Sequence, residues 1–321
     1  MKDILYLVIP CYNEEEVLHE TAKRLLEKFN TMITNELISD KSKILFVNDG
    51  SKDTTWNIIE ELHSQNNIFS GINLSRNRGH QNALLAGLMT AKDYSDMTIS
   101  LDADLQDDVE VLDKFLAQYY DGSDIVYGVR SSRQTDTFFK RTTALAFYKL
   151  MNILGVNMVY NHADYRLMSK RALESLSEYK EVNLFLRGMI PLIGYKYSVV
   201  EYERHERFAG ESKYPLKKMI AFALDGITSL SIKPIRIITG IGFTIFFISV
   251  IALIYSLVVK FLGNTVTGWT SLTLSIWMLG GIQLLSLGVI GEYVGKMYNE
   301  TKQRPRFIIA DKLIDPDKKE N

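Results

Sequence analysis

The stretch Ile99–Gln106 (ISLDADLQ) contains the end of a short apolar run, Met97 to Leu101, and the polar residues that follow it. Such a run is typical of a buried strand. At the end of that strand, residues 102, 104 and 106 can turn their side chains into one crevice at the carboxyl edge of a sheet. Two carboxylates and an amide oxygen suit Mg²⁺ or Mn²⁺ carrying phosphate better than Zn²⁺. The stretch predicts a divalent-metal site at Asp102, Asp104 and Gln106, with a plain polar turn as the alternative.

Further strands and helices alternate before and after this stretch. The other expected strands are residues 4–9, 44–47, 71–74 and 124–129, and amphipathic or apolar helical patterns lie between them. This alternation predicts an α/β, Rossmann-like, mostly parallel sheet with helices on both faces. In such a sheet the ligand binds at the carboxyl ends of the strands.

A dinucleotide-binding domain would share this architecture. It needs a glycine-rich first turn so that the backbone can approach a pyrophosphate. Here the first turn is Pro10–Glu14 (PCYNE), which has no glycine, and the chain has no Gly-x-x-x-x-Gly-Lys-Ser/Thr loop. Phosphate binding is therefore expected to depend on a metal at Asp102 and Asp104.

Composition excludes several other classes. The 321 residues carry a net charge of −1, which argues against a nucleic-acid-binding protein with a basic face. The single cysteine, Cys11, rules out an internal disulfide, and no pair of the five histidines has the spacing of zinc ligands.

Several motifs in order resemble one family. Pro10–Glu14, Asn48–Thr55, Ser75–Gln81 and Asp102–Asp107 are similar to successive motifs of the family 2 glycosyltransferases with the GT-A fold. Within that family the chain resembles the polyprenyl-phosphate glycosyltransferases, such as dolichol-phosphate mannose synthase and the bacterial bactoprenol glucosyltransferases. Gly291–Tyr298 and Arg304–Phe307 extend the resemblance nearly to the end of the chain.

The resemblance implies a pocket for the donor. Pro10, Tyr12, Glu14 and Asp49 are expected to line the site of uracil and ribose, since a carboxylate suits the N–H edge of uracil and an aromatic ring suits its face. Asp102 is expected to bind donor as well as metal. The chain departs from the family pattern at residues 107–109 (DDV), where two prolines are common.

Two further motifs resemble the family's catalytic and closing elements. The stretch 162–168 (HADYRLM) matches the motif that holds the proposed base, here Asp164, and Asp104 is expected to be catalytic with it. Residues 207–214 (RFAGESKY) resemble the mobile loop that closes over the substrates. This implies that Arg207, Ser212 and Lys213 bind the acceptor phosphate.

A basic segment lies between these motifs. Residues 128–141 contain Arg130 and Arg141, and a solvated basic loop is the ordinary interpretation. Because the guanidinium fork matches a phosphate, the alternative is an anion site. We assign Arg130 and Arg141 to the acceptor phosphate.

The C-terminal third is apolar. Residues 237–259 and 268–291 carry no charge and are long enough to cross a bilayer, whereas a buried soluble helix pair is the alternative. Lysines and arginines flank both spans on the domain side, so both termini are expected in the cytoplasm. The expected parts are a catalytic domain (1–213), an amphipathic juxtamembrane segment (214–235), two transmembrane helices (236–295) and a cytoplasmic tail (296–321).

Together these patterns predict an inverting glycosyltransferase of a bacterial plasma membrane, dependent on Mg²⁺ or Mn²⁺. It is expected to move a hexose, with glucose favoured and N-acetylglucosamine the alternative, from a UDP-sugar to polyprenyl phosphate for cell-envelope glycosylation. The resemblance also implies a homotetramer. A processive polysaccharide synthase is disfavoured because the chain lacks a Gln-x-x-Arg-Trp motif. A non-catalytic membrane scaffold of the same fold is the third alternative.

Overall fold

The computed structural model describes residues 2–130, 154, 162–203, 226–262 and 268–314. Its elements in chain order are β1 (Leu5–Cys11), α1 (Leu18–Thr34), β2 (Lys43–Asn48), α2 (Thr55–Gln65), β3 (Phe69–Leu74), α3 (His80–Ala91), β4 (Met97–Ser100), the 3₁₀ helix η1 (Val109–Val111), α4 (Leu112–Tyr120), β5 (Ile125–Arg130), β6 (His162–Ser169), α6 (Lys170–Ser177), α7 (Leu186–Met189), the 3₁₀ helix η2 (Ile190–Ile193), β7 (Tyr197–Tyr202), α9 (Lys233–Phe261), α10 (Trp269–Lys302) and β8 (Ile309–Leu313).

The strands form one eight-stranded sheet in the order β7-β5-β6-β4-β1-β2-β3-β8. Within the described residues β1 pairs in parallel with β2 and β4, β2 with β3, and β5 with β7. The predicted mixed α/β, mostly parallel sheet is therefore confirmed. Strand β6 was not predicted, and it runs antiparallel between β4 and β5.

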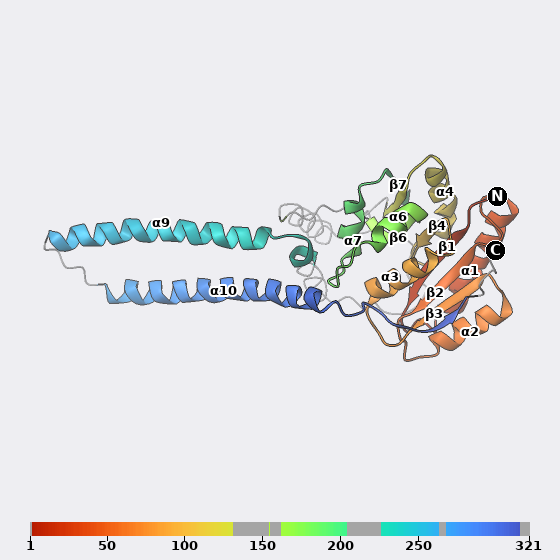
Figure 1. Ribbon diagram of the computed structural model, residues 1–321, viewed down its shortest axis with the longest axis horizontal. Helices are drawn as coiled ribbons and strands as arrows, with labels where there is room; N and C mark the ends of the chain where they lie inside the picture. The colour runs from red at the N-terminus through yellow and green to blue at the C-terminus, as the bar shows by residue number, and fades with distance from the viewer. Residues whose placement is uncertain (1, 131–153, 155–161, 204–225, 263–267, 315–321) are drawn as a thin grey trace.

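Helices cover both faces of the sheet, as its apolar strands require. Leu5, Leu7 and Ile9 of β1 face one core, to which α1, α2 and α4 contribute. Tyr6 and Val8 face a second core, built with α3 and α6. Figure 1 shows these helices on either side of the strands.

Helices α9 and α10 contact each other and extend side by side away from the sheet domain (Figure 1). The predicted hairpin of two long helices is present, although α10 continues to Lys302, beyond the expected end at residue 295. Large apolar side chains such as Phe243, Ile251 and Leu284 are exposed along the hairpin. Among the described residues, one stretch, Met278–Lys302, is long and apolar enough to cross a membrane.

The segment expected as a cytoplasmic tail, residues 296–321, contains the end of α10 and one further strand, β8. Strand β8 pairs antiparallel with β3 and forms the last strand of the catalytic sheet. The side chains of Ile309 and Leu313 pack against the two cores, and Asn73 donates a hydrogen bond of 2.9 Å to Asp311. Apolar contact with an otherwise unpaired edge explains why this short, partly charged segment becomes a strand.

Candidate active site

The turn after β4 holds the predicted metal ligands Asp102, Asp104 and Gln106. The backbone N–H of Gln106 donates to the Asp104 carboxylate over 3.2 Å, and Leu105 between them has a positive φ of 56°. The hydroxyl of Thr21 on α1 donates to the carbonyl of Ala103 over 2.8 Å. These bonds fix the turn locally and anchor it to α1.

The second half of the turn, where the resemblance leads one to expect two prolines, is held by hydrogen bonds from tyrosines. Tyr202 at the end of β7 donates a hydrogen bond of 2.6 Å to the Asp107 carboxylate. Tyr165 on β6 donates to the carbonyl of Asp108 over 3.0 Å. Two contacts from separate strands therefore hold this half of the turn.

Strand β6 carries Asp164 to this turn. Its register with β4 pairs Ser100 with Arg166, so the next positions along the two chains bring Asp164 level with Asp102. The hydroxyl of Ser100 donates to the Asp164 carbonyl over 2.5 Å. The predicted catalytic residue and the predicted metal ligand thus share one edge of the sheet.

Asp164 is engaged in a two-point ion pair. Arg187 of α7 lies 3.0 Å and 2.9 Å from its two carboxylate oxygens. His80 Nε2, at the start of α3, lies 3.3 Å from Asp164 and 3.7 Å from Asp102. Burial raises the pKa of Asp164, but Arg187 and His80 outweigh it and hold that pKa well below the usual range. Asp164 is therefore a weak base.

His80 bridges the two carboxylates. Burial lowers its pKa, but the hydrogen bond to Asp164 and the charges of Asp102 and Asp164 raise it to about 9. The imidazole is therefore cationic at neutral pH. It places positive charge beside Asp102, a predicted metal ligand.

A second arginine lies behind this pair. Arg166 is 1% exposed, and its guanidinium nitrogens have no hydrogen-bond partner in the described part of the chain. One of them is 3.7 Å from Asp164, and the guanidinium carbon is 5.6 Å from the ring centre of Tyr127. Because an unpaired buried charge is costly, Asp164 is the group that compensates Arg166.

The predicted donor pocket is assembled from neighbouring turns. Asp49 accepts hydrogen bonds from the backbone N–H groups of Arg78 over 2.6 Å and Gly79 over 2.9 Å. Gly50 has a φ of 61°, and a Cβ there would lie 2.5 Å from the backbone of Arg76. The two turns therefore touch through backbone. Burial raises the pKa of Asp49 despite these bonds.

The turn after β1 contacts β2 and the segment that follows the Asp49 turn. Pro10 pairs with Val47 at the end of β2, and the backbone N–H of Glu14 donates to Thr55 over 3.0 Å. The ring of Tyr12 is partly exposed. The structure thus brings Pro10, Tyr12 and Glu14 beside the Asp49 turn, and their contacts with a nucleotide stay a prediction.

Of the residues assigned to the acceptor phosphate, the structure describes Arg130. Arg130 ends β5, in register with Tyr202 of β7 and near Asp107, on whose pKa its charge acts. Arg141, Arg207, Ser212 and Lys213 lie outside the described residues. Their role stays a prediction.

The residues at the turn suit a hard divalent cation. Burial raises the pKa of Asp102, His80 opposes this, and the charges of Asp164 and Asp104 raise it further. The Asp107 Oδ2 atom is buried without a hydrogen-bond partner. No group of three or more His, Cys, Asp or Glu side chains has metal-site geometry in the described ranges. Asp102, Asp104 and Gln106 supply the oxygen donors that such a cation prefers, and their role as metal ligands stays a prediction.

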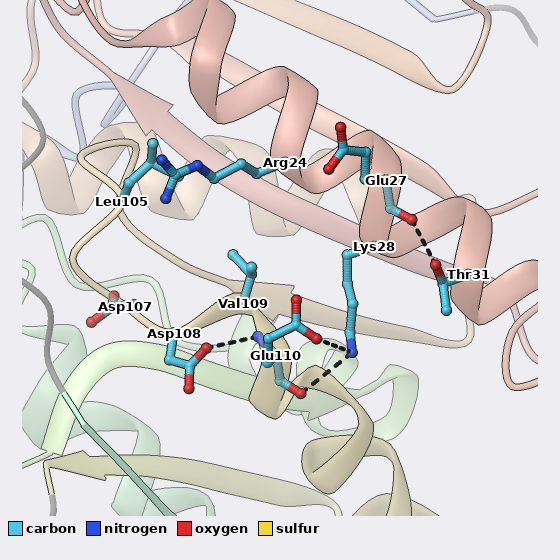
Figure 2. A pocket seen from close by; sticks show the side chains of 9 residues that line it. All are labelled: Arg24, Glu27, Lys28, Thr31, Leu105, Asp107, Asp108, Val109 and Glu110. Atoms are coloured by element: carbon cyan, nitrogen blue, oxygen red, sulfur yellow. Dashed lines mark hydrogen bonds and ion pairs between the residues drawn. The ribbon is translucent and has the colours of Figure 1, made fainter.

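A cavity of about 540 Å³ lies between α1 and the outer side of this turn (Figure 2). It is lined by Arg24, Glu27, Lys28, Thr31, Leu105, Asp107, Asp108, Val109 and Glu110. None of the predicted site residues lines this cavity, so it is distinct from the predicted donor and metal site. Figure 2 shows Lys28 reaching across to Glu110, which it contacts at 3.1 Å.

Sequence reasoning gave no role to His80, Arg166, Arg187 or Tyr202. The spacing of Arg166 and Asp164 was the one available signal. Residues two apart on a strand share a face, so Arg166 is expected beside Asp164 if this stretch is a strand. His80 belongs to a quoted motif but its partners come from other elements. Arg187 and Tyr202 follow β6 in segments that carry no comparable pattern.

Comparison with known proteins identifies the family. Glycosyl transferase family 2 matches residues 6–177, more than half of the chain. An uncharacterized glycosyltransferase of Bacillus subtilis (strain 168), YkoT, is 56% identical over 95% of this chain and 91% of its own. A prophage bactoprenol glucosyl transferase homolog of Escherichia coli (strain K12) is 42% identical, covering 94% and 97%. The bactoprenol glucosyl transferase of Shigella phage SfV is 40% identical, covering 95% and 97%.

Both the matched segment and the sheet agree with the motifs quoted above. The match ends at residue 177, after β6 and α6, so it includes the turn of Asp102 and Asp104 and the strand of Asp164. The chain belongs to glycosyl transferase family 2, and its mixed α/β sheet is of the GT-A type.

Proposed function

We propose that this glycosyltransferase moves a hexose, preferably glucose, from a UDP-sugar to a polyprenyl phosphate with inversion at the anomeric carbon. The names of two relatives, at 42% and 40% identity over nearly the whole chain, support the acceptor class and the sugar. The observation that carries the mechanism is the grouping of Asp102, His80 and the Asp164–Arg187 pair at one sheet edge.

The acceptor needs little help from a base. A phosphate monoester has a second pKa of about 6, so at neutral pH its oxygen is already largely ionised. That oxygen attacks the anomeric carbon, and the bond from this carbon to the donor diphosphate breaks, so UDP leaves with the electron pair. Asp164, held by Arg187, therefore positions the cationic groups and does not take up a proton.

Positive charge must balance the two anionic substrates. A divalent metal bound to Asp102, Asp104 and Gln106 would neutralise the diphosphate. The imidazole of His80, 3.7 Å from Asp102 and 3.3 Å from Asp164, would add a second positive charge when protonated. Arg130, and the arginines and lysine predicted beyond the described residues, serve the acceptor phosphate in this proposal.

The helical hairpin anchors the enzyme to the bilayer of its acceptor. We propose that α9 and α10 both cross the membrane and that the domain is cytoplasmic. The return of the chain through β8 into the catalytic sheet supports this, because the start of α9 and the end of α10 then lie on one side. The basic residues flanking the hairpin support the cytoplasmic side.

The proposal is tested with the purified full-length enzyme in bilayer nanodiscs, Mg²⁺ or Mn²⁺, and undecaprenyl phosphate. UDP-glucose, UDP-N-acetylglucosamine and UDP-galactose are compared by kcat/KM from UDP release. The highest value is expected for UDP-glucose, and none without the lipid phosphate. Absence of lipid-dependent UDP release with every donor would favour the scaffold alternative.

A further inference from the structure

We propose that Glu300, near the end of the second hairpin helix, is a positioning residue that ties the membrane hairpin to the Arg187–Asp164 pair. This inference rests on the proposed function, because it assigns Glu300 a role in that chemistry. It concerns the segment 179–187, which lies between the end of α10 and the site. None of the sequence motifs points to this contact.

The Glu300 carboxylate binds the start of this segment. One oxygen accepts from the backbone N–H of Val182 over 2.9 Å. The other accepts from the backbone N–H of Asn183 over 2.8 Å and from its side-chain amide over 2.5 Å. Hydrogen bonds to a carboxylate are stronger than neutral ones. One helical side chain thus fixes two consecutive peptide groups of the catalytic domain.

Two neighbouring contacts hold the same segment. The Asn183 amide also donates to the carbonyl of Lys296, one turn earlier on α10, over 3.1 Å. Beyond the helix, Arg306 donates to the carbonyl of Tyr179 over 3.1 Å. The end of α10 and Arg306 after it therefore both hydrogen-bond to this segment.

The fixed segment leads directly into the site. Only three residues separate Asn183 from Arg187, and two of them, Phe185 and Leu186, are buried. The backbone N–H of Leu186 donates over 2.8 Å to Gln81, the residue after His80. Arg187 then makes its two-point contact with Asp164. A shift of α10 is thereby transmitted through a short, packed stretch to the ion pair.

Glu300 lies near the end of Met278–Lys302, the candidate membrane-spanning stretch of the hairpin, and beyond residue 291, where the charge-free run ends. The height and tilt of this helix are set by its surroundings in the bilayer. Through Glu300 the same helix sets the position of Arg187. This connection makes the site geometry depend on how the hairpin sits in the membrane, where the lipid phosphate is delivered.

A double-mutant cycle tests the inference in the full-length enzyme in nanodiscs. The variants are Glu300→Ala, Arg187→Ala and their combination, with Asn299→Ala as an exposed control on the same turn. Glu300→Ala is expected to lower kcat roughly tenfold, with the KM for UDP-sugar changed less than about twofold. In the Arg187→Ala background it should lower kcat by less than about twofold. Asn299→Ala should match the wild type.

The other outcomes separate the inference from the proposed function. An equal tenfold loss in both backgrounds would show that Glu300 acts independently of Arg187, and would overturn the inference alone. If Arg187→Ala itself leaves kcat unchanged, the proposed role of the Asp164–Arg187 pair fails, and the inference fails with it. If Glu300→Ala does not fold, the cycle uses Glu300→Gln, which keeps one acceptor oxygen and should give a smaller, still non-additive loss.

Discussion

Replacing Asp164 by asparagine should lower the stability of the catalytic domain as well as the rate of turnover. The change keeps the shape of the side chain but removes the charge that compensates Arg187 and Arg166. Breaking a fully buried ion pair from one side costs about 3–5 kcal/mol. Arg166 is 1% exposed and Arg187 keeps 32% of its side chain exposed, so water can compensate only Arg187. We expect a loss of about 2–3 kcal/mol in the free energy of unfolding.

The assay is thermal unfolding of the full-length protein in nanodiscs, followed by near-UV circular dichroism of the domain. For a domain of this size, each 1 kcal/mol lowers Tm by about 2–4 °C, so a drop of about 4–12 °C is expected. Asp121→Asn is the matched control, since Asp121 lies in an exposed pair 3.9 Å from Lys196 and should cost less than about 0.5 kcal/mol. A Tm for Asp164→Asn equal to that of the control would refute the compensation argument.

Three further predictions concern the metal turn, the fold around it and the topology. Asp104→Asn should abolish turnover with Mg²⁺ or Mn²⁺ while leaving Tm nearly unchanged, and near-normal activity would refute the metal assignment. Lys28→Met should lower the free energy of unfolding by about 1–3 kcal/mol, because the buried ammonium bonds Glu110 at 3.1 Å and Asp113 at 2.9 Å. Lys23 is exposed on the same helix, and Lys23→Met should leave that free energy unchanged. In a Cys11-free background, Asn264→Cys should react with an impermeant thiol reagent outside intact cells and Lys319→Cys should not, and the reverse labelling would mean inverted topology.

The parts of the fold that could be predicted are those whose signal is local. The strands before the turns of Asp49 and Asp104 are short and buried, because both faces of the sheet are covered, and each ends in a polar turn. Helix α3 (His80–Ala91) falls in one of the helical patterns expected between the strands. Helices α9 and α10 follow from the two long charge-free runs, residues 237–259 and 268–291, around which they form.

The parts that could not be predicted depend on contacts far apart in sequence. Strand β6 inserts antiparallel between β4 and β5, and only this register makes Asp164 level with Asp102. The pairing of Asp164 with Arg187 then requires α7 in its observed place. Strand β8 becomes part of the sheet because β3 offers an open edge, a property of the assembled domain and not of residues 309–313 themselves.

The identity of the lipid product distinguishes a polyprenyl-phosphate glucosyltransferase from the alternatives. Radiolabelled UDP-glucose and undecaprenyl phosphate are incubated with the enzyme in nanodiscs, and the extracted lipid is analysed by mass spectrometry and NMR. A single β-linked glucose on the lipid phosphate is expected, with one UDP released for each lipid formed. A polymer that grows with time, an α-linked product, or UDP release without a labelled lipid would contradict it.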